Sequence, residues 1–383
     1  MKIKSVRARK VLNSRKKPTI EITINKKYSA AAPSGASTGE HEIKAYPTQG
    51  IDFAIDFINK FKHLKGIKIE RFQDLKQVEK LLPIIKGNPM IALEFAILKA
   101  ASKNKVWHFL NPNADDLPMP LGNVVGGGAH IKTKEKPDMQ EFLLLPEKTD
   151  FADAKFANEY VHKLVGEKLG GAKMTDEGAW APQMDTISIL DLIKSVIDKV
   201  EKELGVKIGI GLDVAASEFF DGKNYKYTNY SKKIPKKNLT VKEQINFMEI
   251  ITKKYKLTYV EDAFQENDFD SFKELKRRTK TLVCGDDLTT TNLERLRKAK
   301  DSINAIIIKP NQIGSLIKTK EAVDFALKNK IVPVISHRSG ETMDASISHL
   351  AVAWDIPIIK CGIHGKERQA KLKELLKIKK ELK

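Results

Sequence analysis

The sequence contains few cysteines and no long apolar segment. Cys284 and Cys361 are its only cysteines, and their spacing fits neither a disulfide framework nor a thiolate metal site. No segment approaches the roughly 20 uncharged apolar residues that a membrane-spanning helix requires. The N-terminal segment also lacks the apolar core of a signal peptide. These absences predict a cytoplasmic protein with two buried, reduced thiols and no membrane partner.

Aromatic residues are scarce as well, at 7%, while the net charge reaches +19. Such a charge invites a nucleic-acid partner, but the lysines are spread along the whole chain instead of clustering with aromatic residues. In residues 371–383, Lys alternates with Leu, Ile and Glu at helical spacing, which is typical of a solvated helix face. We therefore expect no nucleic-acid partner and only a small contribution of this surface to attracting an anionic substrate.

The length of 383 residues is too great for one ordinary domain unless a large part of it forms an α/β barrel. Such a barrel commonly takes about 250 residues. With 41% hydrophobic and 31% charged residues, the chain has enough apolar surface for a sizeable core and no compositional sign of disorder. A barrel with a smaller companion domain is the natural expectation.

The N-terminal part has the pattern of an α+β domain. KIKSVRARKVL and TIEITI carry strand signals, and the small, polar loop APSGASTGEHE follows them. Residues 51–64 and 88–102 then place apolar side chains three and four apart, as helices do. Residues 111–120 are rich in Pro and Asn, as linkers are. We therefore predict an α+β domain over residues 1–115 and a barrel over residues 116–383.

Short apolar runs recur after the predicted linker, and each ends in polar residues before a helix-like segment. They are IGIGLD, LTYVED, TLVCGDD, NAIIIKPN, IVPVISHRS and IPIIKCG. This pattern is typical of parallel strands buried on both faces. The interval 213–261 is longer than the others, and we expect a mobile loop over the strand ends there. A doubly wound sheet could also produce repeated βα units, but a barrel collects residues from many successive strand ends on one face.

Polar residues at these strand ends predict a metal-dependent catalytic site. In chain order they are Asp213, Glu261, Asp286, Lys309, His337, Arg338, Ser339 and Lys360. Three converging carboxylates would repel one another without a cation, and oxygen ligands suit Mg²⁺. A single acid alone would more simply be a salt bridge or a helix N-cap. Burial of Lys309 should favour its neutral amine and hence a general base, with an ion pair to a neighbouring acid as the alternative.

A set of segments resembles the signature segments of the enolase family, in the order in which that family has them. They are APSGASTGEHE, MQEFLLLP, TDEGAWAP, GLDVAASEF, VEDAF, GDDLTTTN, IIIKPNQIGS, ISHRSGETMD and IKCG. The resemblance implies an α/β fold with an enolase-type modified TIM barrel after a smaller α+β domain. It also implies a homo-oligomeric hydro-lyase that converts 2-phosphoglycerate to phosphoenolpyruvate in glycolysis and gluconeogenesis.

The resemblance further implies a role for individual residues. The metal ligands would be Asp213, Glu261, Asp286 and, for a second Mg²⁺ that binds with substrate, Ser37. Lys309 would abstract the proton, and Glu177, with its partner Glu141, would protonate the departing hydroxyl. The substrate-binding residues would be His130, Gln140, Glu141, Glu261, Asp286, Lys309, His337, Arg338, Ser339 and Lys360. Arg338 and Ser339 would grip the phosphate, and Lys360 would contact the carboxylate. A lone histidine such as His130 is ordinarily structural, and the simple alternative for Glu177 is a loop cap.

Some segments depart from the family pattern. NSRKKPT stands where the family usually has DSRGNPT, the segment after GEHE lacks the usual acidic continuation, and residues 131–139 are longer and more basic than usual. These departures leave two alternatives: an enolase-like paralogue that dehydrates another acid, and a non-catalytic binding protein. The second is the weaker, because a scaffold has no use for so costly a cluster of buried charges.

Overall fold

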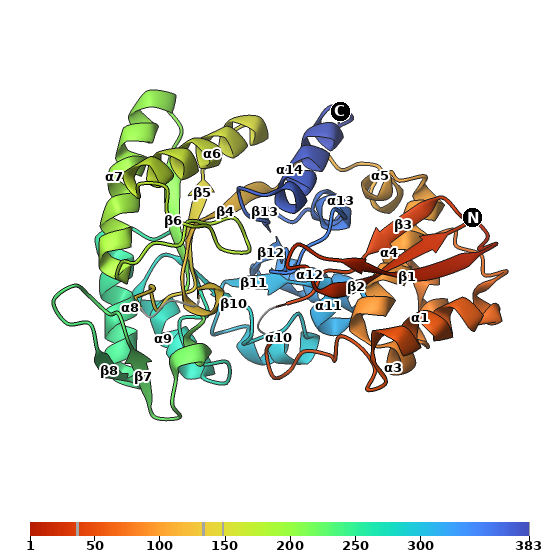
Figure 1. The fold of residues 1–383 in the computed structure, drawn as a ribbon, viewed down its shortest axis with the longest axis horizontal. Helices are drawn as coiled ribbons and strands as arrows, with labels where there is room; N and C mark the ends of the chain where they lie inside the picture. Colours follow the sequence, from red (N-terminus) through yellow and green to blue (C-terminus); the bar gives the residue numbers. More distant parts are fainter. Residues whose placement is uncertain (36–37, 132–134, 148, 383) are drawn as a thin grey trace.

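The computed structural model describes residues 1–35, 38–131, 135–147 and 149–382. The strands are β1 (Val6–Leu12), β2 (Pro18–Ile24), β3 (Tyr28–Ala31), β4 (Met119–Gly126), β5 (Glu141–Pro146), β6 (Ile208–Asp213), β7 (Asn224–Tyr227), β8 (Lys237–Thr240), β9 (Tyr259–Glu261), β10 (Leu282–Gly285), β11 (Ala305–Ile308), β12 (Val332–Ser336) and β13 (Ile358–Lys360). Figure 1 shows how they divide among an N-terminal sheet, a barrel and the separate pair of β7 and β8.

The helices follow the strands along most of the chain. They are α1 (Gly50–Lys60), α2 (Lys76–Glu79), α3 (Leu82–Ile85), α4 (Gly87–Ser102), α5 (Val106–Leu110), α6 (Phe151–Lys168), α7 (Thr186–Leu204), α8 (Val241–Tyr255), α9 (Phe269–Arg278), α10 (Leu293–Ala299), α11 (Pro310–Ile313), α12 (Leu316–Lys328), α13 (Ser346–Ala353) and α14 (Lys366–Lys379). Short 3₁₀ turns are η1 (Lys62–Leu64), η2 (Phe72–Leu75), η3 (Gly128–His130) and η4 (Ala216–Phe219). Within the described residues, none of the helices has the length and apolar character needed to cross a bilayer.

The N-terminal sheet has the antiparallel order β1-β2-β3 and packs on α1 and α4. The alternating Ile20, Ile22 and Ile24 are fully buried, as expected of a half-buried strand. The predicted helix over 51–64 is shorter, because α1 ends at Lys60 and Phe61 takes an extended backbone. The predicted first strand is also shorter at its start, since β1 begins at Val6.

The barrel is closed, with the order β10-β11-β12-β13-β4-β5-β6-β9 among the described strands. The predicted apolar runs form β6 and β9 to β13, and these strands are parallel to one another where they pair. The structure therefore has the barrel and not the open doubly wound sheet. β5 runs antiparallel to both β4 and β6, so this is a modified barrel. β4 begins at Met119, inside the segment that we predicted to be a linker.

The long interval between β6 and β9 is mostly folded, so our expectation of a loop was too simple. It contains η4, the hairpin of β7 and β8, and α8. Tyr225 and Tyr227 of the hairpin are buried, and the Tyr227 hydroxyl donates to Gln244 Oε1 at 2.8 Å. The Tyr227 ring also packs edge-on against Phe247 of α8. An aromatic cluster thus holds the hairpin on the helix.

The N-terminal elements lie beside α11, α12 and α13 of the barrel (Figure 1). Ser34 and Gly340 exchange backbone hydrogen bonds of 2.9 and 2.8 Å. Lys99 Nζ lies 2.6 Å from Asp344 Oδ2, and the Ala31 amide donates to the same oxygen at 3.3 Å. These contacts bring the loop after β3 to the C-terminal ends of the barrel strands. Cys284 and Cys361 are free and buried, as predicted.

Candidate active site

Three buried acids stand at the ends of neighbouring barrel strands. Asp213 ends β6, Glu261 ends β9 directly opposite it, and Asp286 follows β10. Parallel strands bring their carboxyl ends to one edge of the barrel, so the sequence order of the strands puts these side chains side by side. Glu261 is completely buried, and the other two are nearly so.

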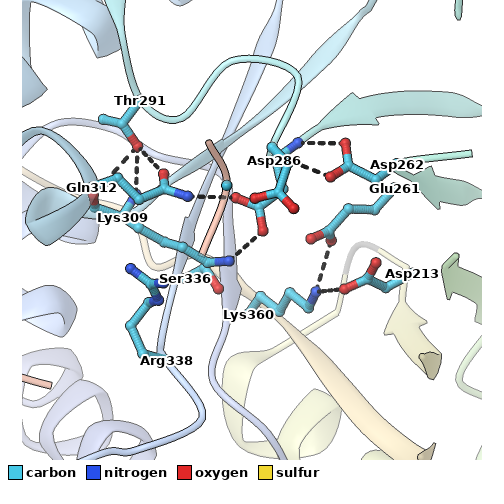
Figure 2. Close-up of polar contacts among 12 residues, drawn as sticks. Asp213, Glu261, Asp262, Asp286, Thr291, Lys309, Gln312, Ser336, Arg338 and Lys360 are labelled. Carbon is cyan, nitrogen blue, oxygen red and sulfur yellow. Dashed lines mark hydrogen bonds and ion pairs between the residues drawn. The ribbon is translucent and has the colours of Figure 1, made fainter. Parts of the chain in front are cut away.

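Lys360, at the end of β13, lies among carboxylates. Its Nζ is 2.9 Å from Asp213 Oδ2 and 2.8 Å from Glu261 Oε2 (Figure 2). It also lies 2.8 Å from Glu141 Oε2. Burial raises the pKa of Glu261, and the negative charge of Asp213 raises it further, whereas Lys360 opposes both. One ammonium therefore offsets only part of the negative charge that the barrel buries here.

The residues present fit a divalent cation. Glu261 Oε1 is buried without a hydrogen-bond partner among the described residues. An unsatisfied carboxylate oxygen beside further carboxylates is the oxygen-only donor set that Mg²⁺ prefers. Among the described residues, however, the three acids whose ligand atoms lie within 4.8 Å of one another are Asp262, Asp286 and Asp287. The predicted trio of Asp213, Glu261 and Asp286 is not drawn together so closely within the described part of the chain.

Asp286 is held by three neighbours (Figure 2). Lys309 Nζ contacts Asp286 Oδ2, and Gln312 Nε2 donates to Asp286 Oδ1 at 2.9 Å. Asp262 accepts hydrogen bonds from the backbone amides of Asp286 at 2.9 Å and Asp287 at 2.8 Å. Asp262 and Asp287 are absent from the sequence prediction. Each directly follows a predicted strand-end acid, in VEDAF and GDDLTTTN, and this position could have identified it as a site residue.

The charge state that we predicted for Lys309 is wrong for this structure. Burial lowers the pKa of Lys309, but the negative charge of Asp286 and that of Glu261 raise it, and the net direction is upward. The amine is therefore held in its charged form by an ion pair, which was the stated alternative. Burial alone could not decide this, because the outcome depends on which acid the neighbouring strand supplies.

Glu141, Glu177 and His130 form a second group, with ligand atoms within 4.8 Å of one another. Burial raises the pKa of Glu177, yet His130 and a hydrogen bond with Glu141 bring it below its usual value. The pKa of Glu141 is raised, chiefly by burial. Burial lowers the pKa of His130, but Glu177 and Asp176 raise it to about 9. Paired carboxyls are expected to separate in pKa, and here the raised value belongs to Glu141.

Arg338 lies just after β12 and is paired with an acid that sequence reasoning missed. Its guanidinium donates from both Nη1 and Nη2 to the two oxygens of Glu42, each at 3.0 Å, and from Nη1 to Asn311 Oδ1 at 3.0 Å. Glu42 belongs to the loop APSGASTGEHE, whose resemblance was noted without a role for this residue. Ser37 of the same loop lies outside the described residues.

One small cavity of about 40 Å³ joins these groups. Its lining includes the predicted residues His130, Gln140, Glu141, Glu177, Asp213, Asp286, Lys309, His337, Arg338, Ser339 and Lys360. Glu42, Glu218, Asp262 and Asp287 also line it and were not predicted. The Gln140 amide donates to the Asp213 carbonyl at 3.0 Å, and His337 Nε2 lies 3.7 Å from Glu177 Oε2. The structure thus brings both ends of the predicted site to one cavity.

A closed barrel with buried acids, lysines and an arginine around one cavity at its strand ends defines a class of protein: a barrel enzyme equipped for a divalent metal and an anionic substrate. Residues 3–108 match the family described as "Enolase, N-terminal domain", and residues 114–383 match "Enolase, C-terminal TIM barrel domain". The chain belongs to the enolase family.

Curated relatives match over nearly the full length of both chains. The enolase of Methanothermobacter thermautotrophicus is 42% identical over 99% of this chain and 97% of its own. The enolase of Methanosphaera stadtmanae is 40% identical over the same shares. The enolase of Picrophilus torridus is 36% identical and is covered to 99% in both chains.

Proposed function

We infer that this protein is a hydro-lyase that catalyses the reversible dehydration of 2-phosphoglycerate to phosphoenolpyruvate, a step of glycolysis and gluconeogenesis. The observation that carries this function is the single cavity on which Lys309, the Glu141–Glu177 pair and Arg338 converge beside the strand-end acids. The full-length similarity to enolases supports the same reaction over a paralogue that dehydrates another acid. It also supports an enzyme over a non-catalytic binding protein.

We propose that Asp213, Glu261 and Asp286 hold a first Mg²⁺ and that Ser37 contributes to a second when substrate binds. A divalent cation held there would compensate the negative charge that develops on the substrate carboxylate. The unsatisfied Glu261 Oε1 supports this assignment. Removal of metal by a chelator should abolish activity without unfolding the barrel.

Lys309 is the proposed general base. An amine accepts a proton only in its neutral form, and Asp286 is the group that keeps Lys309 charged. Another partner therefore has to compensate the charge of Asp286 before Lys309 can take the proton from carbon. The contact between these two residues makes the state of the base depend on the state of the acid.

The Glu141–Glu177 pair is the proposed source of the proton for the departing hydroxyl. Ligand atoms of the two carboxyls lie within 4.8 Å of each other, and Glu141 has the raised pKa, so it is the member of the pair that holds a proton more readily. Delivery by Glu177 therefore involves passage of that proton across the pair. His130, which lies 3.9 Å from Glu177 Oε1, stabilises the negative charge that Glu177 carries before and after the transfer.

The remaining residues bind the substrate in this proposal. Arg338 and Ser339 hold the phosphate, for which a guanidinium fork is suited, and Lys360 contacts the carboxylate. Gln140, His130 and His337 complete the contacts. Glu42 already binds both ends of the Arg338 guanidinium, and three acids surround Lys360. The substrate therefore has to share Arg338 and Lys360 with these carboxylates or displace them.

We also propose a cytoplasmic homo-oligomer, dimeric or larger, and a domain division at residues 1–115 and 116–383. The family resemblance supports the oligomer. The start of β4 at Met119 supports the division.

Phosphoenolpyruvate formation from 2-phosphoglycerate, with Mg²⁺ and with chelator, tests this function. A well-folded protein that forms no phosphoenolpyruvate but dehydrates another acid would favour the paralogue. One that binds no acid in the cavity would favour a non-catalytic role.

A further inference from the structure

Arg368 of α14 is buried directly behind the segment that carries Arg338 and Ser339. Its side chain is among the largest that the fold buries completely, with 1% of the residue exposed. Gly362 makes room for it, because a Cβ at this position would lie 2.8 Å from Arg368 Cγ. The fold therefore provides a fitted space for this arginine.

The Arg368 guanidinium holds neutral oxygens of two distant segments. Its Nη2 donates to the Ser339 carbonyl at 2.8 Å and to the Arg338 carbonyl at 3.3 Å. Its Nη1 donates to Ser14 Oγ at 3.1 Å, and the Glu341 backbone amide donates to the same Ser14 oxygen at 3.0 Å. One side chain thus joins the backbone of the proposed phosphate grip to the loop after β1.

None of these partners neutralises the charge of Arg368. No carboxylate among the described residues forms an ion pair with it, and its Nε is buried without a hydrogen-bond partner in that part of the chain. Lys371, one turn later on α14, provides the contrast, because it is paired with Glu341 at 2.6 Å. A buried cation is costly unless an anion compensates it, so an unpaired one beside an anion-binding segment has a natural partner in the ligand.

The charge of Arg368 reaches the cavity. Burial lowers the pKa of His337, and Arg368 lowers it further. Burial raises the pKa of Glu177, whereas His130, the hydrogen bond with Glu141 and the charge of Arg368 lower it. Both residues line the same cavity as Arg338.

We propose that Arg368 is a positioning residue for the phosphate: it fixes the backbone of Arg338 and Ser339 and adds behind them a positive charge that no ion pair with a described carboxylate neutralises. The inference rests on the proposed function, because it takes this segment to be the phosphate site. It assigns to α14 a part in substrate recognition in addition to packing.

The test measures binding of inorganic phosphate by calorimetry, with competitive inhibition of turnover as a second readout. Arg368→Gln retains a donor for the carbonyls but removes the charge, and it should weaken phosphate binding by about tenfold, a change worth ~1.4 kcal/mol. Arg368→Lys retains the charge with fewer donors and should stay within about threefold of the parent. Lys373→Gln removes the same charge from an exposed position of α14 and should bind phosphate like the parent.

The outcomes separate the possibilities. Parent-like binding by Arg368→Gln would overturn the inference, as would an equal loss in folded Arg368→Lys and Arg368→Gln, which would indicate a purely structural role. If Arg368→Gln does not fold, Arg368→Lys decides: binding within about threefold supports the inference and a tenfold loss overturns it. Absence of competitive phosphate binding by an active parent would remove the phosphate site itself, and the inference with it, while leaving the reaction intact.

Discussion

Lys309 and Asp286 touch through their charged ends, from positions just beyond the neighbouring strands β11 and β10. The proposed base and a proposed metal ligand thus share one ion pair. Substitution of either residue should disturb both functions to different extents, and the difference can be measured.

Lys309→Ala should stop exchange of the substrate C2 proton with solvent, because no other amine takes its place, and lower turnover by roughly 10²–10⁴-fold. Proton exchange is followed by NMR in deuterated buffer. Metal-dependent binding of 2-phosphoglycerate, measured by calorimetry, should persist. Exchange at the parent rate would disqualify Lys309 as the base.

Glu177→Gln should have the complementary effect. Loss of the proton donor slows departure of the hydroxyl by roughly 10²–10⁴-fold, whereas proton abstraction at C2 continues. The same NMR experiment should then show exchange without formation of phosphoenolpyruvate. If exchange disappears together with turnover, Glu177 does not act separately from Lys309.

Asp286→Asn should weaken Mg²⁺ binding at least about tenfold, the lower end of the loss seen when even outer partners of a metal ligand are removed. Calorimetric titration of the substrate-free protein measures it. Asp270→Asn, which removes an exposed acid of α9, is the matched control and should leave the isotherm unchanged. An unchanged isotherm for Asp286→Asn as well would exclude this residue from the metal site.

The Lys99–Asp344 ion pair should stabilise the contact between the N-terminal elements and the barrel. Burial raises the pKa of Asp344, but Lys99 outweighs it, so the pKa is lower in the folded protein. The stabilisation is therefore complete above the unfolded pKa of about 3.9 and is lost as pH falls through the lower folded pKa. Asp344→Asn should lower the free energy of unfolding by about 2–3 kcal/mol at neutral pH. This is somewhat less than the loss expected for a completely buried ion pair, because both side chains retain slight exposure.

Urea unfolding of both proteins between pH 7 and pH 3 measures this effect. The difference in free energy of unfolding should shrink at the acid end of the range. A difference that stays constant with pH would show that the carboxylate charge is not what stabilises the contact.

Much of the barrel could be predicted because parallel strands buried on both faces leave continuous apolar runs that end in polar residues. β4 and β5 escaped this reasoning. β4 begins among the prolines of 111–120, which indicate a linker, and β5 runs antiparallel to its neighbours, so its site residue Glu141 stands at its start instead of its end. Closure of the barrel by an antiparallel pair depends on strand partners that periodicity does not reveal.

The site was predictable to a similar extent. Strand ends revealed the acids and bases, but the pairing of Glu42 with Arg338 joins segments from opposite ends of the chain. The lysine-rich C-terminal run indicates a solvated face, and yet Lys371 is 1% exposed because Glu341 compensates its charge. Which cation is buried is decided by partners that only the folded structure brings together.

The most direct test of the central claim is the rate of phosphoenolpyruvate formation by the purified protein. With 2-phosphoglycerate and Mg²⁺ the rate should be substantial, and excess chelator should abolish it reversibly while the circular dichroism spectrum stays unchanged. A folded protein that forms no phosphoenolpyruvate with Mg²⁺, or forms it equally well with chelator, would contradict the account.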